Sequence, residues 1–148
     1  RRKLSFLIRR RGHLRPLPSL LFVLSLPFIM VLSVNSNVLC WNVRGLNYDA
    51  KLLALTNAIN SSGCAVICLQ ETKMASFDNA FIKSCCPRRY DKFAFVPSRG
   101  ASGGLVTIWN SSIFHADIVS SDDFAQVINF KLMQSAHRCT LVNVYRPC

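Results

Sequence analysis

The sequence predicts an α+β domain, and three observations predict it. An apolar run over residues 38–43 and another over 65–69 flank a segment with helical spacing. Short β-like runs then follow from about residue 90 to the end of the chain. Hydrophobic residues make up 51% and charged residues 17% of the 148 residues, which excludes intrinsic disorder and is enough for one domain with its own core.

The first predicted unit is a strand, a helix and a second strand. Residues 38–43 and 65–69 are the apolar runs that we expect to be the strands. Between them, apolar side chains recur at helical spacing within residues 49–60, at Leu52, Leu55 and Ile59. The candidate caps of this helix are Asn47 or Asp49 at its start and Gly63 at its end.

The ends of these two strands carry the first candidate site. Because a helix connects them, the strands are expected to be parallel neighbours, which places both of their carboxyl ends at one edge of the sheet. Asn42 lies at the end of the first strand, and Glu71 lies just past the end of the second, 29 positions later. Ligand sites in open α/β sheets gather at this edge, so we expect the two side chains to share one crevice.

The remaining elements are predicted to be mostly short strands. Residues 126–132 alternate, with Ile128, Phe130 and Leu132 on one face. A run rich in Gly and Ser over 98–104 favours a simple β-turn over a phosphate-binding loop, because no helix follows it. The other predicted elements are a helical turn over 77–83 and strands over 90–96, 105–109, 113–119 and 138–145.

The first 36 residues differ from the rest and are predicted to lie outside the domain of residues 37–148. Residues 1–34 hold seven basic and no acidic side chains, and the apolar run 17–34 has the minimum length of a membrane-spanning helix. A membrane anchor, a secretory signal and a flank without structural role are all compatible with this pattern. A membrane partner through residues 17–34 is therefore one expectation.

The net charge indicates which kind of partner suits this chain, and the spacing of the cysteines indicates whether they could bind zinc. The formal net charge is +11, of which residues 35–148 contribute +4, a mild excess that suits a polyanionic partner. The seven cysteines include no CxxC pair and no histidine at zinc-finger spacing, which disfavours a zinc site. We interpret Cys40, Cys64, Cys68 and Cys139 as reduced, buried side chains, since each lies in or beside an apolar run.

Four segments together resemble a known family. These are Leu39-Cys40-Trp41-Asn42-Val43-Arg44-Gly45-Leu46-Asn47, Val66-Ile67-Cys68-Leu69-Gln70-Glu71-Thr72-Lys73, the run 97–109, and Val142-Asn143-Val144-Tyr145-Arg146-Pro147. Over residues 37–148 they resemble the endonuclease/exonuclease/phosphatase superfamily, and within it the endonuclease domain of plant LINE-type (non-LTR) retrotransposons. The resemblance implies an αββα two-layer sandwich of the DNase I-like kind, here incomplete.

The resemblance also implies a chemistry, the hydrolysis of DNA phosphodiesters with Mg²⁺, or alternatively Mn²⁺. Glu71 would be the metal-binding carboxylate, since hard oxygen ligands suit Mg²⁺. Asn42 would contact the metal-bound water or the scissile phosphate, and Tyr145 would donate a hydrogen bond to that phosphate. Arg44, Lys73 and Arg99 would be contacts to backbone phosphates, which add affinity without reading sequence. The nucleus is the location that the family implies.

The resemblance is partial, and three hypotheses follow from that. An Asp-x-Asn motif and a final Ser-Asp-His motif are expected in the family, and His13, His115 and His137 match neither. The chain is therefore expected to be an inactive endonuclease relic, because the general-base contribution is missing. The alternatives are a working fragment that needs a further segment, and a non-catalytic binding module that is membrane-anchored or secreted.

Overall fold

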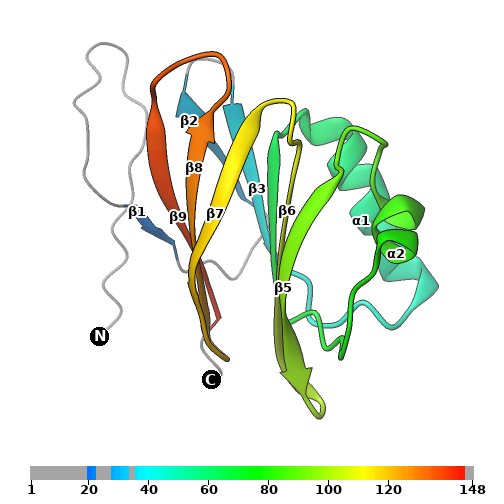
Figure 1. Ribbon diagram of the computed structural model, residues 1–148. Helices are drawn as coiled ribbons and strands as arrows, with labels where there is room; N and C mark the ends of the chain where they lie inside the picture. Colours follow the sequence, from blue (N-terminus) through cyan, green and yellow to red (C-terminus); the bar gives the residue numbers. More distant parts are fainter. Residues whose placement is uncertain (1–19, 23–27, 34–35, 146–148) are drawn as a thin grey trace.

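The computed structural model describes residues 20–22, 28–33 and 36–145, which form two β-sheets and two helices (Figure 1). One sheet has the strand order β2-β3-β4-β6-β5, and the other has the order β1-β9-β8-β7. The strands of the first sheet are β2 (Phe28–Ser33), β3 (Ser36–Asn42), β4 (Val66–Gln70), β5 (Lys92–Arg99) and β6 (Ser102–Trp109). Those of the second are β1 (Leu20–Phe22), β7 (Phe114–Ser121), β8 (Ala125–Leu132) and β9 (Arg138–Val144).

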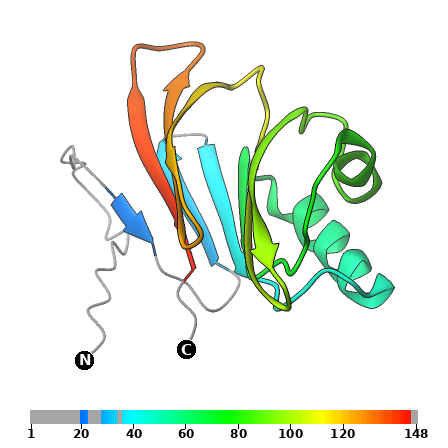
Figure 2. The ribbon, with the colours of Figure 1, turned by 60° about the horizontal axis from the view of Figure 1, so that its bottom comes forward.

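The two sheets face each other, and both helices lie on the outer side of the first sheet (Figures 1 and 2). These helices are α1 (Asp49–Ser62) and α2 (Asn79–Cys85). The order of layers is thus sheet, sheet, helices, and the outer face of the second sheet carries no helix among the described residues. The α+β sandwich expected from the sequence is confirmed.

The strand–helix–strand unit forms as predicted. β3 and β4 are parallel neighbours, with Val38 opposite Val66 and Asn42 opposite Gln70. Gly63 ends α1 in the left-handed conformation that favours glycine. The expected caps at the other end are wrong, because Tyr48 is the N-cap and makes no side-chain capping hydrogen bond.

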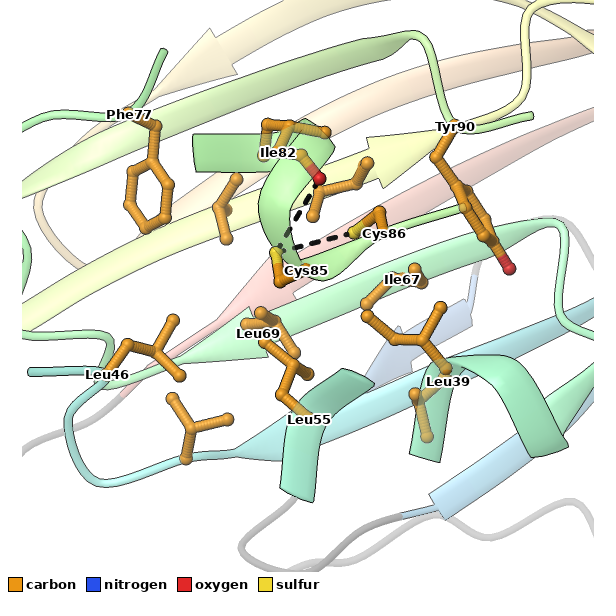
Figure 3. Packing of buried hydrophobic residues seen from close by; sticks show 14 of the residues in the cluster. Leu39, Leu46, Leu55, Ile67, Leu69, Phe77, Ile82, Cys85, Cys86 and Tyr90 are labelled. Atoms are coloured by element: carbon orange, nitrogen blue, oxygen red, sulfur yellow. Dashed lines mark hydrogen bonds between the residues drawn. The ribbon is translucent and has the colours of Figure 1, made fainter. Parts of the chain in front are cut away.

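The two helices are held by one apolar cluster on the outer face of the first sheet (Figure 3). Leu55 and Ile59 of α1 are fully buried there against alternate residues of the strands, such as Leu39 and Ile67. Burying such a side chain contributes about 1.5–3 kcal/mol relative to leaving it exposed. The cluster also contains Cys85 and Cys86 at the end of α2, whose sulfur atoms are 3.7 Å apart.

The space between the sheets is filled by the other faces of the same strands. Val38 and Cys40 of β3 point to this side and pack in a cluster with Ile128 and Phe130 of β8. As predicted, Cys40, Cys64 and Cys68 are free and buried. Cys139 is also free, but it is half-buried and not buried as expected. Alternation along β3 therefore gives a helix-facing side and a sheet-facing side, and Asn42 continues the sheet-facing side of Val38 and Cys40.

The described parts of the apolar run 17–34, residues 20–22 and 28–33, are strands. β1 pairs with β9 in parallel orientation, and β2 pairs with β3 in antiparallel orientation. Backbone groups of both segments are therefore hydrogen-bonded to neighbouring strands. Among the described residues, neither helix is long and apolar enough to cross a membrane.

Candidate active site at the carboxyl ends of strands β3 and β4

Asn42 and Glu71 lie at the same edge of the first sheet. Asn42 is the last residue of β3 and is aligned with Gln70, the residue directly before Glu71. The Asn42 side chain is half-buried, and its Oδ1 accepts a hydrogen bond from the Arg44 backbone N–H at 3.2 Å. The prediction that parallel pairing brings these two residues to one edge is therefore confirmed.

Backbone hydrogen bonds join the loops that follow the two strands. Gly45 donates to the Glu71 carbonyl at 2.7 Å, and Leu46 donates to the Thr72 carbonyl at 2.9 Å. The second loop is joined in turn to the β5–β6 hairpin, because the Lys73 N–H donates to the Gly103 carbonyl at 3.0 Å. Three segments that are distant in sequence thus form one continuous, hydrogen-bonded rim.

The rim holds its backbone in a strained conformation. Arg44, Glu71 and Lys73 have φ angles of 52°, 54° and 56°, and among the described residues they are the non-glycine residues with positive φ. Each such residue costs on the order of 1–2 kcal/mol relative to ordinary helical or extended backbone. Strain of this kind gathers at binding and catalytic sites, and here it coincides with the residues that the sequence singled out.

Two glycines permit the close packing of this rim. Gly104 has a φ of 88°, and a Cβ there would collide with the buried Thr72 hydroxyl. Gly45 has a φ of 100°, and a Cβ there would lie 3.3 Å from Cδ of Lys73. The run rich in Gly and Ser makes a two-residue hairpin turn, as predicted, and its second half also supports the loop that carries Glu71.

Tyr145 approaches the rim from the second sheet. It follows the last residue of β9, and its backbone N–H donates to the Phe124 carbonyl at 2.7 Å. Its ring is close to the hairpin, since Cε1 lies 3.9 Å from the position of a Cβ on Gly103. The three residues expected to act together, Asn42, Glu71 and Tyr145, therefore lie at the same end of the two-sheet sandwich.

The predicted phosphate-binding cations differ in their surroundings. Nζ of Lys73 lies 3.6 Å from Oε1 of Glu71, and both side chains are partly exposed. Arg44 is exposed and is held at its carbonyl, which accepts from Nζ of Lys51 at 2.6 Å. Arg99 lies at the tip of β5 and is paired with Asp123 at 2.7 Å, which offsets its charge. Arg44 and Lys73 are thus the two predicted cations in the loops that follow β3 and β4.

The oxygen donors on the rim fit one way of holding a divalent ion. Glu71 offers a carboxylate and Asn42 offers an amide oxygen, the hard ligands that Mg²⁺ or Mn²⁺ takes. The described residues hold no group of three or more His, Cys, Asp or Glu side chains that could enclose a metal. The pair fits an ion that is bound by one or two protein ligands and shared with a phosphate, and it does not fit a metal cage built only from protein.

The two described histidines lie at the end of the second sheet that is opposite Tyr145. His115 is aligned with Lys131, and His137 directly precedes β9, whereas Tyr145 follows the opposite end of that strand. A strand of this length separates its ends by roughly 20 Å. His13 lies outside the described residues. No described histidine can therefore reach Glu71 or Tyr145.

Sequence reasoning missed the buried polar residues behind the rim. Gln70 and Asn143 are 3% and 2% exposed, and Nε2 of Gln70 donates to Oδ1 of Asn143 at 2.7 Å between the sheets. A polar residue within an apolar strand was the available signal, because such a residue needs a partner once it is buried. The sequence does not indicate which partner that is, since the two residues are 73 positions apart.

Comparisons with known proteins agree with this fold. The model of the endonuclease/exonuclease/phosphatase family matches residues 39–144, which is most of the chain. The fold is similar to the AP endonuclease LMAP from Leishmania major, with a TM-score of 0.57, 22% identity, and coverage of 73% of this chain and 39% of that one. It is also similar to the Xenopus laevis APE2 catalytic domain, with a TM-score of 0.52, 20% identity, and coverage of 75% and 45%. The chain thus spans less than half of either structure, and no curated protein sequence matches it.

Proposed function

Because this chain belongs to the endonuclease/exonuclease/phosphatase family, we propose that its rim binds a divalent metal ion together with a DNA phosphodiester. The observation that carries the proposal is the meeting of Asn42, Glu71 and Tyr145 at one end of the sandwich, on a strained rim. We propose further that these 148 residues do not hydrolyse the bond by themselves, since no described histidine can serve as general base there.

Each residue of the candidate site has a distinct task in this proposal. Glu71 and Asn42 hold the ion, which when bound supplies positive charge to the phosphate and to its leaving oxygen. Tyr145 donates a hydrogen bond to a phosphate oxygen, and a bond to a charged acceptor is stronger than a neutral one. Lys73 and Arg44 neutralise neighbouring phosphates. In the absence of an ion, the ammonium of Lys73 offsets the charge of Glu71.

The resemblance to plant LINE-type retrotransposon endonucleases supports a proposal of origin. The chain would descend from such a domain, whose motifs lie within residues 37–148, and it would act in the nucleus. Mg²⁺ is the proposed physiological ion, with Mn²⁺ as its laboratory substitute. The expectations of a working fragment and of a membrane-anchored or secreted module remain alternatives that no particular contact favours.

Two measurements on the purified chain test the proposal. Binding to a fluorescent DNA duplex in Mn²⁺ should weaken about tenfold, or about 1.4 kcal/mol, in Glu71→Gln. It should be unchanged in the matched control Asp117→Asn, because that carboxylate is exposed on β7, where it forms an ion pair with His115. If the Glu71→Gln variant and the unmodified chain bind DNA equally well in Mn²⁺, Glu71 is not the metal ligand.

Hydrolysis is tested separately by nicking of supercoiled plasmid in Mg²⁺ and in Mn²⁺. We expect no conversion to open circles. Metal-dependent nicking that Glu71→Gln abolishes would show that the chain is a working endonuclease, and it would overturn the proposed inactivity while keeping the assignment of the site.

A further inference from the structure

Four buried polar side chains form a chain of hydrogen bonds between the two sheets. Gln70 of β4 and Thr107 of β6 belong to the first sheet, and Gln126 of β8 and Asn143 of β9 belong to the second. Each is at most 3% exposed. Gln70 donates to Asn143 at 2.7 Å, Asn143 donates to Thr107 at 3.2 Å, and Thr107 donates to Gln126 at 2.6 Å.

The hydrogen-bond partners of Asn143 fix the orientation of two side-chain amides, those of Asn143 and Gln70. Nδ2 of Asn143 lies within hydrogen-bond distance of the carbonyls of Leu69 and Val106, at 3.4 and 3.2 Å, and a carbonyl only accepts. Oδ1 of Asn143 must therefore face Gln70, which can meet it only with its NH₂ group. Oε1 of Gln70 is then left without a donor from the described part of the protein.

This hydrogen bond lies directly behind the site. Gln70 is the residue before Glu71, and it shares its face of the sheet with the aligned Asn42. Asn143 is two residues before Tyr145, so alternation along β9 directs both toward the first sheet. The bond thus connects the end of the strand that carries Glu71 with the end of the strand that leads to Tyr145.

We propose that Gln70 and Asn143 are positioning residues, which hold Tyr145 at the distance from Glu71 and Asn42 that simultaneous contact with one phosphate requires. The proposal rests on the proposed function of the rim. A polar pair suits this task because its hydrogen bond has a defined length and direction, whereas apolar packing between two sheets tolerates sliding. A broken pair would leave the metal ligands on their own sheet but would free Tyr145 to shift.

The alternative is that the four hydrogen-bonded side chains only stabilise the fold and do not position Tyr145. A control variant, Thr107→Val, distinguishes the two possibilities. Thr107→Val removes two hydrogen bonds from the same network and keeps the volume and the β-branched shape. It leaves the Gln70–Asn143 bond in place. Asn143→Leu and Gln70→Met each remove that bond, and Gln70→Met spares the other partners of Asn143, so at least one of the two variants should fold.

The first readout is the coupling between the pair and Tyr145 in DNA binding with Mn²⁺. Tyr145→Phe should weaken binding about tenfold in the unmodified chain and in Thr107→Val, as expected for loss of a hydrogen bond to a charged group. In Gln70→Met or Asn143→Leu, adding Tyr145→Phe should change the Kd by less than about twofold, because the hydroxyl is already displaced. A full tenfold effect of Tyr145→Phe in those variants overturns the proposal.

The second readout does not depend on DNA or metal. The Tyr145 ring and the Gly103 α-protons should give a nuclear Overhauser effect in the unmodified chain and in Thr107→Val, and lose it in Gln70→Met and Asn143→Leu. Persistence of the signal in both latter variants overturns the positioning role, and so does equal loss in Thr107→Val. If neither Glu71→Gln nor Tyr145→Phe changes DNA binding, the proposed function of the rim fails, and the proton signals alone decide whether the pair positions Tyr145.

Discussion

Replacing Arg44 by glycine should stabilise the protein. Arg44 has a φ of 52°, and its exposed side chain makes no hydrogen bond or ion pair within the described part of the protein. The contacts that hold this residue use its backbone, namely its N–H to Asn42 and its carbonyl to Lys51, and both survive the substitution. The change therefore removes strain and leaves the loop geometry in place.

The size of the gain follows from two opposing terms. Relief of the left-handed conformation contributes about 1–2 kcal/mol. The greater freedom of glycine in the unfolded chain subtracts about 0.5–1 kcal/mol. The net gain is about 0.5–1 kcal/mol. At an unfolding entropy of about 2.1 cal/mol/K per residue, a chain of 148 residues should show a Tm higher by about 2–3 °C.

Thermal and urea unfolding measure the effect, and two variants control it. Arg44→Ala removes the same charge and keeps the strain, so it should be less stable than Arg44→Gly by about 1 kcal/mol. Arg88→Gly places glycine in an exposed turn at negative φ, and it should destabilise by a few tenths of a kcal/mol or more. If Arg44→Gly is no more stable than Arg44→Ala, the strain on this rim is not what the φ angle indicates.

Three further perturbations test the surroundings of the site. Gly104→Ala should lower the free energy of unfolding in urea by roughly 2–5 kcal/mol, since a Cβ there adds a collision to a strained φ. In the control Gly63→Ala the Cβ meets open space, so the loss should be about 1 kcal/mol. Equal losses in the two variants would show that the Cβ at residue 104 meets no collision. Burial raises the pKa of Tyr90, whose hydroxyl donates to the Cys64 carbonyl. Tyr90→Phe should therefore lower the free energy of unfolding by about 1–2 kcal/mol at pH 7. This difference between the unmodified chain and the variant should become smaller above about pH 10, because tyrosine ionises there first in the unfolded chain. A difference that grows above pH 10 would contradict the raised pKa of Tyr90. Removing residues 1–35 uncovers the edge of β3 that pairs with β2, and light scattering should then show association that removal of residues 1–19 alone does not cause.

The part of the fold that the sequence predicted is the part that local pattern determines. Helical spacing at Leu55 and Ile59 identified α1, and two apolar runs joined by a helix implied parallel strands. Parallel pairing then placed Asn42 and Glu71 at one edge without knowledge of any contact. This step worked because it depends on chain direction, which the crossover fixes, and not on the exact register.

The part that the sequence did not predict depends on partners distant along the chain. The positive φ of Glu71 and Lys73 results from backbone bonds to other loops, and neither residue type favours that conformation by itself. The sequence also did not indicate that Arg99 of the β5–β6 hairpin pairs with Asp123 of the β7–β8 turn, and this ion pair offsets the charge that Arg99 offers to a phosphate. Apolar residues in the run 17–34 fit a strand as well as a helix, and pairing with β3 and β9 decides between them where the structure describes that run.

The arrangement of the sheets gives a physical reason to separate binding from turnover. The proposed metal ligands come from the first sheet and Tyr145 comes from the second, so a bound phosphate would lie across the end of the gap between the sheets. A general base has to reach the same end. His137 is fixed at the opposite end by the β8–β9 pairing, and moving it there would require that ladder to unpair. Binding at the rim needs no such change, which is why we expect a metal-dependent affinity for DNA to persist where hydrolysis does not.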